Sequence, residues 1–266
     1  MIVIYHDNCV DGFTAAWVAR TVYPGATFVP AQYGQDPPNL VGQDVLIVDF
    51  SYPRETLLRM HASAKSIRVL DHHKSAQADL SELDFCLFDM DRSGAGLAWD
   101  ELRGDGEPRL ALVDYVEDRD LWRWKLPASR EISAFIGSWE KSFERWSIVA
   151  EELETQRDRA VAEGGAILRA LNGYVAHKVP LATIFQLGNY LVPVINTTHA
   201  TSELVGKLSE GHPFAAGWFQ DGAGSFIYSL RSRGDFDVSE VAKAFGGGGH
   251  RNAAGFKCNG MVHFKL

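Results

Sequence analysis

The sequence contains few cysteines. Only Cys9, Cys86 and Cys258 occur among its 266 residues, widely spaced and odd in number. A disulfide framework is therefore not expected, and a reducing compartment is favoured. No stretch approaches the ~20 apolar residues of a membrane span, and the apolar residues at the N-terminus are too few for a signal peptide. These absences predict a cytoplasmic protein that does not contact the membrane.

The sequence also lacks an excess of positive charge. It has 26 Lys and Arg residues against 34 Asp and Glu residues, so the formal net charge is -8. This balance argues against a protein that coats long nucleic acid or an acidic membrane through bulk electrostatics. It is compatible with a small anionic substrate held by metal ions. No repeat or low-complexity segment is present, and 46% apolar residues suffice for a packed core.

Short apolar runs alternate with amphipathic segments in the first half of the chain. The runs at 2–5, 44–50 and 66–70 predict buried strands, whereas residues 12–23 have the spacing of a helix. Strands interleaved with helices predict βαβ units and a parallel sheet that is covered on both faces.

The rest of the chain has a different pattern. Its middle part contains no segment typical of a strand and is rich in Ala, Leu, Glu and Arg at helical spacing, and strand patterns return from Leu181. We therefore predict an α/β protein with two domains joined by a helical connector. The predicted boundaries are 1–139 for the parallel-sheet domain, 140–179 for the connector and 180–266 for a smaller α/β domain of the substrate-binding type.

Polar clusters follow three of the predicted strands. They are His6 with Asp11, then Asp49, then Asp71-His72-His73. Each cluster alone is better explained by a helix cap or a turn. However, ligands of an open parallel sheet bind outside the carboxyl ends of its strands, so three clusters at those ends indicate a site. Carboxylate and imidazole groups are ligands for Mn²⁺, Zn²⁺ or Fe²⁺.

A fourth acidic cluster at 117–122 follows a helical stretch. It is either a solvated helix end or the source of a further carboxylate ligand, from Asp118 or Asp120. In the C-terminal part, the glycines at 246–249 precede His250. Consecutive glycines allow backbone N–H groups to approach a phosphate closely, and Arg231 offers a guanidinium fork suited to phosphate. The alternative for the glycine run is a flexible loop.

Together these motifs resemble the DHH family of phosphoesterases. Asp71-His72-His73 is the triplet that names the family, and the order of the other clusters agrees with it. Residues 245–256 resemble the glycine-rich motif of the DHH-associated domain in RecJ-like and NrnA-like nucleases. Arg231-Ser232 resembles the substrate-contacting pair of that domain. The resemblance spans the whole chain and implies a DHH catalytic domain followed by a DHH-associated substrate-binding domain.

The resemblance also implies roles for individual residues. The implied metal ligands are His6, Asp11, Asp49, His72 and Asp118, with Asp49 between two ions and Asp120 as the alternative to Asp118. Asp71 is implied to orient an imidazole, and His73 to face the substrate or leaving group. With Arg231, these two residues form the implied catalytic set. The implied substrate-binding residues are Arg231, Ser232, Gly247, Gly248, Gly249 and His250.

The sequence departs from the family pattern at Cys9. Relatives usually have two Asp residues, separated by a single residue, before the glycine. Cys9 stands where the first Asp would be. Three explanations remain open. Asp7 or Asn8 replaces the missing carboxylate, the Cys9 thiolate itself is a ligand, or the first metal ion has fewer ligands.

The implied function is hydrolysis of phosphodiester or phosphomonoester bonds with two divalent ions, Mn²⁺ first and Mg²⁺ or Co²⁺ as alternatives. The implied substrates are linear dinucleotides, bisphosphonucleotides and short single-stranded oligonucleotides, the last as for an exonuclease, but no long duplex. One alternative is an inorganic pyrophosphatase or polyphosphatase. Another is a non-catalytic nucleotide-binding regulator with a degenerate metal site. The sequence leaves open the cleavage polarity, the choice of RNA or DNA, and the formation of a homodimer.

Overall fold

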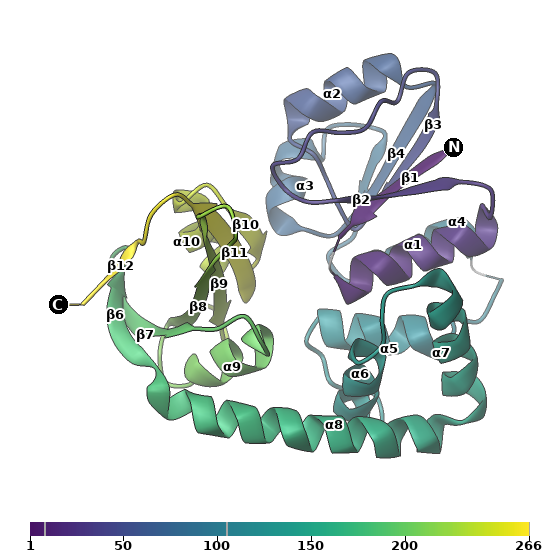
Figure 1. Ribbon diagram of the computed structural model, residues 1–266. Helices are drawn as coiled ribbons and strands as arrows, with labels where there is room; N and C mark the ends of the chain where they lie inside the picture. Colours follow the sequence, from purple (N-terminus) through teal and green to yellow (C-terminus); the bar gives the residue numbers. More distant parts are fainter. Residues whose placement is uncertain (8, 105, 266) are drawn as a thin grey trace. The chain divides into compact units, whose positions relative to one another are not determined.

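Figure 1 shows a computed structural model of the chain, which describes residues 1–7, 9–104 and 106–265. The chain divides into two compact units, Met1–Leu168 and Arg169–Leu266. Asn8, one of the candidates for the first motif, lies outside the described residues. Among the helices of the described chain, none is both long enough and apolar enough to cross a membrane.

The first unit contains the predicted parallel sheet, which is confirmed. Its five strands lie in the order β2-β1-β3-β4-β5, and every neighbouring pair is parallel. The strands are β1 (Ile2–His6), β2 (Thr27–Ala31), β3 (Asp44–Val48), β4 (Ser66–Asp71) and β5 (Cys86–Phe88). Leu46 and Val48 of β3 belong to one hydrophobic core, and the alternate residues Val45 and Ile47 belong to another. The sheet is therefore buried on both faces, which explains its continuous apolar strands.

Helices supply both of these cores. The core that contains Leu46 takes residues from α1 (Val10–Val22), α4 (Gly94–Arg103), α5 (Ala111–Asp120), α6 (Ser129–Gly137) and α7 (Phe143–Thr155). The opposite core takes residues from α2 (Arg54–Ser63) and α3 (Lys74–Leu80). The two sets of helices lie on opposite sides of the sheet in Figure 1.

The unit boundary differs from the connector expected at 140–179. Trp146 of α7 is fully buried, and its indole N–H donates to Thr14 Oγ1 of α1 at 2.9 Å. Leu153 is equally buried. The first half of the expected connector therefore belongs to the first unit, and only α8 (Arg157–Lys178) runs from one unit into the other.

The second unit has a seven-stranded sheet in the order β10-β11-β9-β8-β7-β6-β12. Among its strand pairs, β7 and β8 are parallel and the others are antiparallel. The strands are β6 (Thr183–Leu187), β7 (Tyr190–Asn196), β8 (Phe214–Gln220), β9 (Phe226–Ser232), β10 (Gly248–His250), β11 (Ala253–Cys258) and β12 (His263–Phe264). The helix α9 (Thr201–Leu208) follows β7, and α10 (Val238–Ala244) follows β9. A 3-10 turn at Val179–Leu181 precedes β6.

Candidate metal centre

The carboxyl ends of three neighbouring strands carry the polar clusters of the first unit. In the sheet register Tyr5 pairs with Val48, and Val48 pairs with Leu70, so β1, β3 and β4 end at the same level. His6 ends β1, and Asp49 follows β3 directly. The parallel register therefore brings side chains that are far apart in sequence to one edge of the sheet.

Asp49 lies at the centre of this edge and is buried. Its Oδ1 is 3.0 Å from His72 Nε2, and its Oδ2 is 3.6 Å from His6 Nδ1. The backbone of Asp49 has φ 54°, in the left-handed region that non-glycine residues rarely occupy. Such strain persists only where the surroundings fix the residue, and it is common at functional sites.

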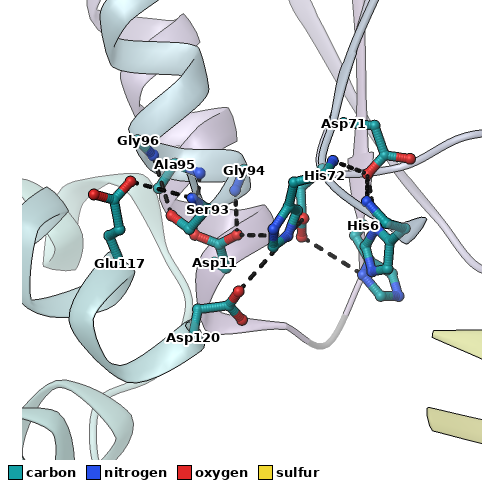
Figure 2. A network of polar contacts seen from close by, with 12 residues as sticks. His6, Asp11, Asp71, His72, Ser93, Gly94, Ala95, Gly96, Glu117 and Asp120 are labelled. Carbon is teal, nitrogen blue, oxygen red and sulfur yellow. Dashed lines mark hydrogen bonds and ion pairs between the residues drawn. The ribbon is translucent and has the colours of Figure 1, made fainter. Parts of the chain in front are cut away.

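The carboxylate of Asp11 joins the first turn of α1 to the first turn of α4, as Figure 2 shows. It accepts hydrogen bonds from the backbone N–H groups of Gly94 and Ala95, at 2.6 and 3.0 Å. Its Oδ2 also lies 3.5 Å from His72 Nε2. A Cβ at position 94 would lie 2.3 Å from Asp49 Cβ, so only glycine fits there.

Sequence reasoning missed this contribution of α4. Ser93 caps the helix by accepting from Gly96 N, and Glu117 accepts from Ser93 N. The signal was present in Ser93-Gly94-Ala95-Gly96, because a serine cap before small residues marks a helix start that packs closely against its neighbours. Figure 2 shows these contacts beside Asp11.

Asp118 and Asp120 of the fourth cluster, which the sequence left as alternatives, lie in different surroundings. Asp120 Oδ2 lies 3.6 Å from His72 Nε2, within the cluster. Asp118 instead accepts hydrogen bonds from Lys125 N, Leu126 N and Ser129 Oγ, and so closes the loop between α5 and α6. The structure therefore places Asp120, and not the preferred Asp118, beside His72, because the end of α5 directs Asp118 toward its own loop.

Asp71 holds the ring of His73, which lies two positions later in the sequence. Its Oδ1 lies 2.6 Å from His73 Nδ1 and accepts from His72 N at 2.8 Å, while Ser51 Oγ donates to Oδ2 at 2.5 Å. Asp71 is completely buried. These bonds fix the orientation of the His73 ring.

The cluster also shifts the pKa values of its members. Burial raises the pKa of Asp11 well above its usual value, and the neighbouring Asp49 and Asp120 raise it further. Burial also opposes the charge of Asp49, but the nearby His6 and the hydrogen-bonded His72 outweigh it, so the pKa of Asp49 is lowered. Burial likewise opposes the charge on His72, yet Asp49 and Asp120 raise the pKa of His72 well above its usual value.

Several buried polar atoms of the cluster have no hydrogen-bond partner among the described residues. They are His6 Nδ1, Asp49 Oδ2 and Asp120 Oδ2. Buried polar groups are normally satisfied, so these atoms indicate a missing ligand. Oxygen and imidazole nitrogen are donors that divalent cations accept, and the residues therefore fit a metal ion.

Three groups of potential ligand atoms share Asp49, which lies with His6 and Cys9, with Asp11 and His72, and with Asp71 and His73. In each group, all the atoms lie within 4.8 Å of one another. We name His6, Cys9 and Asp49 the first metal position. We name Asp11, Asp49 and His72, together with the adjacent Asp120, the second metal position.

Comparison with known proteins identifies the family of the chain. The family model of the DHHA1 domain matches residues 188–261. The uncharacterized protein R106 of Acanthamoeba polyphaga mimivirus is 30% identical over 292 residues, covering 98% of this chain and 68% of that protein. The chain belongs to the DHH phosphoesterase family.

Two solved structures share the fold of this DHH-family chain. One is PggH from Vibrio cholerae, titled a pGpG-specific phosphodiesterase, with a TM-score of 0.51, 12% identity, and coverage of 97% of this chain and 92% of that one. The other is an exopolyphosphatase-related protein from Bacteroides fragilis, with a TM-score of 0.50, 16% identity, and coverage of 98% and 87%. The predicted α/β architecture of a DHH protein is thereby confirmed.

Within the DHHA1 domain, the predicted pair Arg231-Ser232 divides into two environments. Arg231 Nη2 donates to Ser202 Oγ at 2.8 Å, near the start of α9. Ser232 is buried, and its hydroxyl donates to Phe236 O and accepts from Asn252 Nδ2. Its hydroxyl thus ties together two loops of the domain, and the contact of Ser232 with substrate stays a prediction.

The glycine run of the DHHA1 domain is part of a hairpin. Gly248 and His250 lie on β10, the edge strand that pairs with β11, so the flexible-loop alternative is wrong. A Cβ on Gly247 would lie 2.1 Å from Gly255 O, and one on Gly249 would lie 2.6 Å from Ala253 O. Close packing against β11 therefore explains Gly247 and Gly249, whatever else the run binds.

Proposed function

We propose that this chain is a metal-dependent phosphoesterase that hydrolyses phosphodiester or phosphomonoester bonds in small phosphorylated compounds. One observation carries the proposal. Carboxylates and imidazoles from three strand ends and two helices meet at one buried point, where several of their atoms have no hydrogen-bond partner among the described residues. A purely structural cluster would satisfy these atoms internally.

The residues that would hold two divalent ions are those of the two metal positions, which share Asp49. Two bound ions supply positive charge that lowers the pKa of an attacking water and stabilises the leaving oxygen. Asp11 and Asp49 are held in place by the start of α4 and by the strained end of β3. The chain therefore presents ligands whose positions are fixed before the ions bind.

His73 is positioned to handle a proton. Burial opposes its charge, but the bonded Asp71 raises the pKa of His73 above its usual value. The raised pKa favours the protonated imidazole, which is suited to protonate the leaving oxygen of the substrate. Asp71 keeps the tautomer and the ring orientation that this step requires.

The substrate class follows from charge and from fold similarity. The net charge of -8 disfavours a long nucleic-acid track. PggH, which shares the fold, is titled a phosphodiesterase specific for pGpG, a linear dinucleotide. We therefore propose linear dinucleotides first, then short oligonucleotides and bisphosphonucleotides, with Arg231 and His250 as phosphate contacts.

A substrate panel tests this proposal. The metal-free full chain is incubated with Mn²⁺, Co²⁺, Zn²⁺ or Mg²⁺ and with a linear dinucleotide, a labelled trinucleotide, a bisphosphonucleotide, a cyclic dinucleotide or pyrophosphate. We expect metal-dependent turnover of the linear dinucleotide and its loss in His72→Ala. Turnover of pyrophosphate alone would support the pyrophosphatase alternative, and no turnover with any metal would support the binding regulator.

A further inference from the structure

Cys9 occupies an unusual place at the start of α1. It is the N-cap residue of this helix, with φ -105° and ψ 140°, and its side chain makes no capping hydrogen bond. Ser, Thr, Asp and Asn are the residues that normally cap helices through their side chains. Helix capping by the side chain therefore does not explain the cysteine at this position.

The thiol faces the edge of the sheet. Cys9 Sγ lies within 4.8 Å of a ligand atom of His6 and of Asp49, which also lie within that distance of each other. Two of the atoms at this point, His6 Nδ1 and Asp49 Oδ2, are buried and have no hydrogen-bond partner in the described residues. These unpartnered atoms are a second observation, independent of the cysteine, that points to a ligand at the same place.

The nearby carboxylate of Asp7 is directed elsewhere. Its Oδ2 accepts a hydrogen bond from Nε2 of Gln32, the residue that follows β2, at 2.8 Å. The second metal position, in contrast, draws on the carboxylates of Asp11, Asp49 and Asp120 and on the imidazole of His72. The first position therefore includes sulfur among its potential ligand atoms, whereas the second offers only oxygen and nitrogen.

We propose that the Cys9 thiolate, with His6 and Asp49, binds the ion of the first metal position, and that this position selects Zn²⁺, Co²⁺ or Fe²⁺ over Mn²⁺ and Mg²⁺. Thiolate ligands favour softer ions, whereas carboxylate-rich sites suit Mn²⁺ and Mg²⁺. Binding displaces the thiol proton into solvent as the metal–sulfur bond forms. The inference rests on the metal centre of the proposed function, and it makes that centre asymmetric.

Cobalt spectroscopy tests the inference without measuring activity. Co²⁺ is titrated into the metal-free full chain, and the near-ultraviolet absorption that arises only from a thiolate–cobalt bond is recorded. We expect this band to saturate at one equivalent of Co²⁺, to be absent in Cys9→Ser and Cys9→Asp, and to persist in the matched controls Cys86→Ser and Cys258→Ser. Circular dichroism of each variant reports whether it is folded.

Competition gives a second readout. Cys9→Asp should bind Co²⁺ at the first position ~10-fold or more weakly relative to Mn²⁺ than the natural chain does, because a carboxylate replaces the thiolate. Alkylation followed by mass spectrometry gives a readout that needs no variant. In the natural chain, bound Zn²⁺ should protect the Cys9 thiol from the alkylating reagent.

The outcomes separate the inference from the proposed function. Co²⁺ binding without the thiolate band, or rapid alkylation of Cys9 in the Zn²⁺-loaded chain, would overturn the role of Cys9 and leave the phosphoesterase proposal standing. Failure of the chain to bind any divalent ion would overturn both. A band that disappears only in Cys86→Ser or Cys258→Ser would assign the sulfur ligand to another residue and overturn the inference.

Discussion

The first unit and the DHHA1 domain satisfy their buried polar side chains to different degrees. In the first unit, Asp49, His6 and Asp120 each have a buried atom without a hydrogen-bond partner in the described chain. In the described residues of the DHHA1 domain, every buried side-chain nitrogen and oxygen has a partner, as for the Ser232 hydroxyl. A conspicuous motif alone therefore does not mark a ligand site, whereas unsatisfied buried atoms that gather within one group of potential ligands do.

The same contrast occurs within one helix. Asp118 and Asp120 lie two residues apart at the end of α5, and both have strongly acidic surroundings in the sequence. The carboxylate of Asp118 accepts hydrogen bonds from the following loop. The Oδ2 atom of Asp120 instead approaches His72 and has no hydrogen-bond partner in the described chain. The comparison predicts a stability role for the first residue and a metal role for the second.

The largest expected effect is the loss of activity in Asp120→Asn. The variant should lose more than the ~10–100-fold typical of residues that only orient a ligand. Its metal-free form should be no less stable, because burial and Asp49 raise the pKa of Asp120 despite the opposing effect of His72, and the amide carries no charge. Steady-state kinetics and thermal denaturation of the metal-free protein measure the two effects.

Asp118→Asn is the matched control. It should cost ~1–3 kcal/mol of unfolding free energy, because buried donors of the loop lose a charged acceptor, while the folded enzyme keeps its metal affinity. If Asp118→Asn abolished metal binding and Asp120→Asn did not, the assignment of the two carboxylates would be reversed.

Asp71→Asn should have an intermediate effect. Asp71 contacts His73 and Ser51 and is expected to orient the imidazole, so kcat should fall by ~10–100-fold. The affinity for metal should change less than the rate, as measured by isothermal titration calorimetry alongside the kinetics. A loss of metal affinity as large as that in Asp120→Asn would instead make Asp71 a ligand.

Metal affinity should rise with pH. The raised pKa of His72 favours the protonated imidazole in the metal-free protein, and an ion must displace that proton. Each displaced proton increases the apparent affinity by up to ~10-fold per pH unit until the pH exceeds the pKa of His72. Calorimetry in two buffers of different ionisation enthalpy counts the protons released, and affinity independent of pH between 6 and 8 would argue against His72 as a ligand.

The smallest expected effect on catalysis concerns Gly247→Ala. The new methyl group would meet Gly255 O, so the variant should lose ~1–3 kcal/mol of stability. Gly222 has open space around its Cβ position and an ordinary φ, so Gly222→Ala should change stability by less than ~0.5 kcal/mol. Chemical denaturation measures both. An unchanged stability in Gly247→Ala together with a raised KM would favour the predicted phosphate contact over packing.

The parallel sheet and the position of the site could be predicted from sequence, because both depend on local patterns. Buried β-branched runs such as 44–48 specify strands, and the polar residues that follow them reach the same edge by the geometry of parallel sheets. The departure from the family pattern at Cys9 was also visible in the sequence, because it lies within one short motif.

The rest depends on contacts between distant residues. Trp146 belongs to the first unit through Thr14, which lies 132 positions earlier, and Gly247 is explained by Gly255 on the next strand. The choice between Asp118 and Asp120 depends on how α5 ends, where Trp122 and Trp124 adopt left-handed backbone conformations. No local pattern encodes these contacts.

Anomalous diffraction from crystals soaked in Mn²⁺ or Zn²⁺ tests the central claim most directly, namely that the cluster around Asp49 is a metal centre. The account predicts anomalous peaks on both sides of the Asp49 carboxylate, one beside His6 and Cys9 and the other beside His72 and Asp120. Zn²⁺ should occupy the first position more fully than Mn²⁺. Crystals with no anomalous peak at Asp49 in either metal would contradict the account.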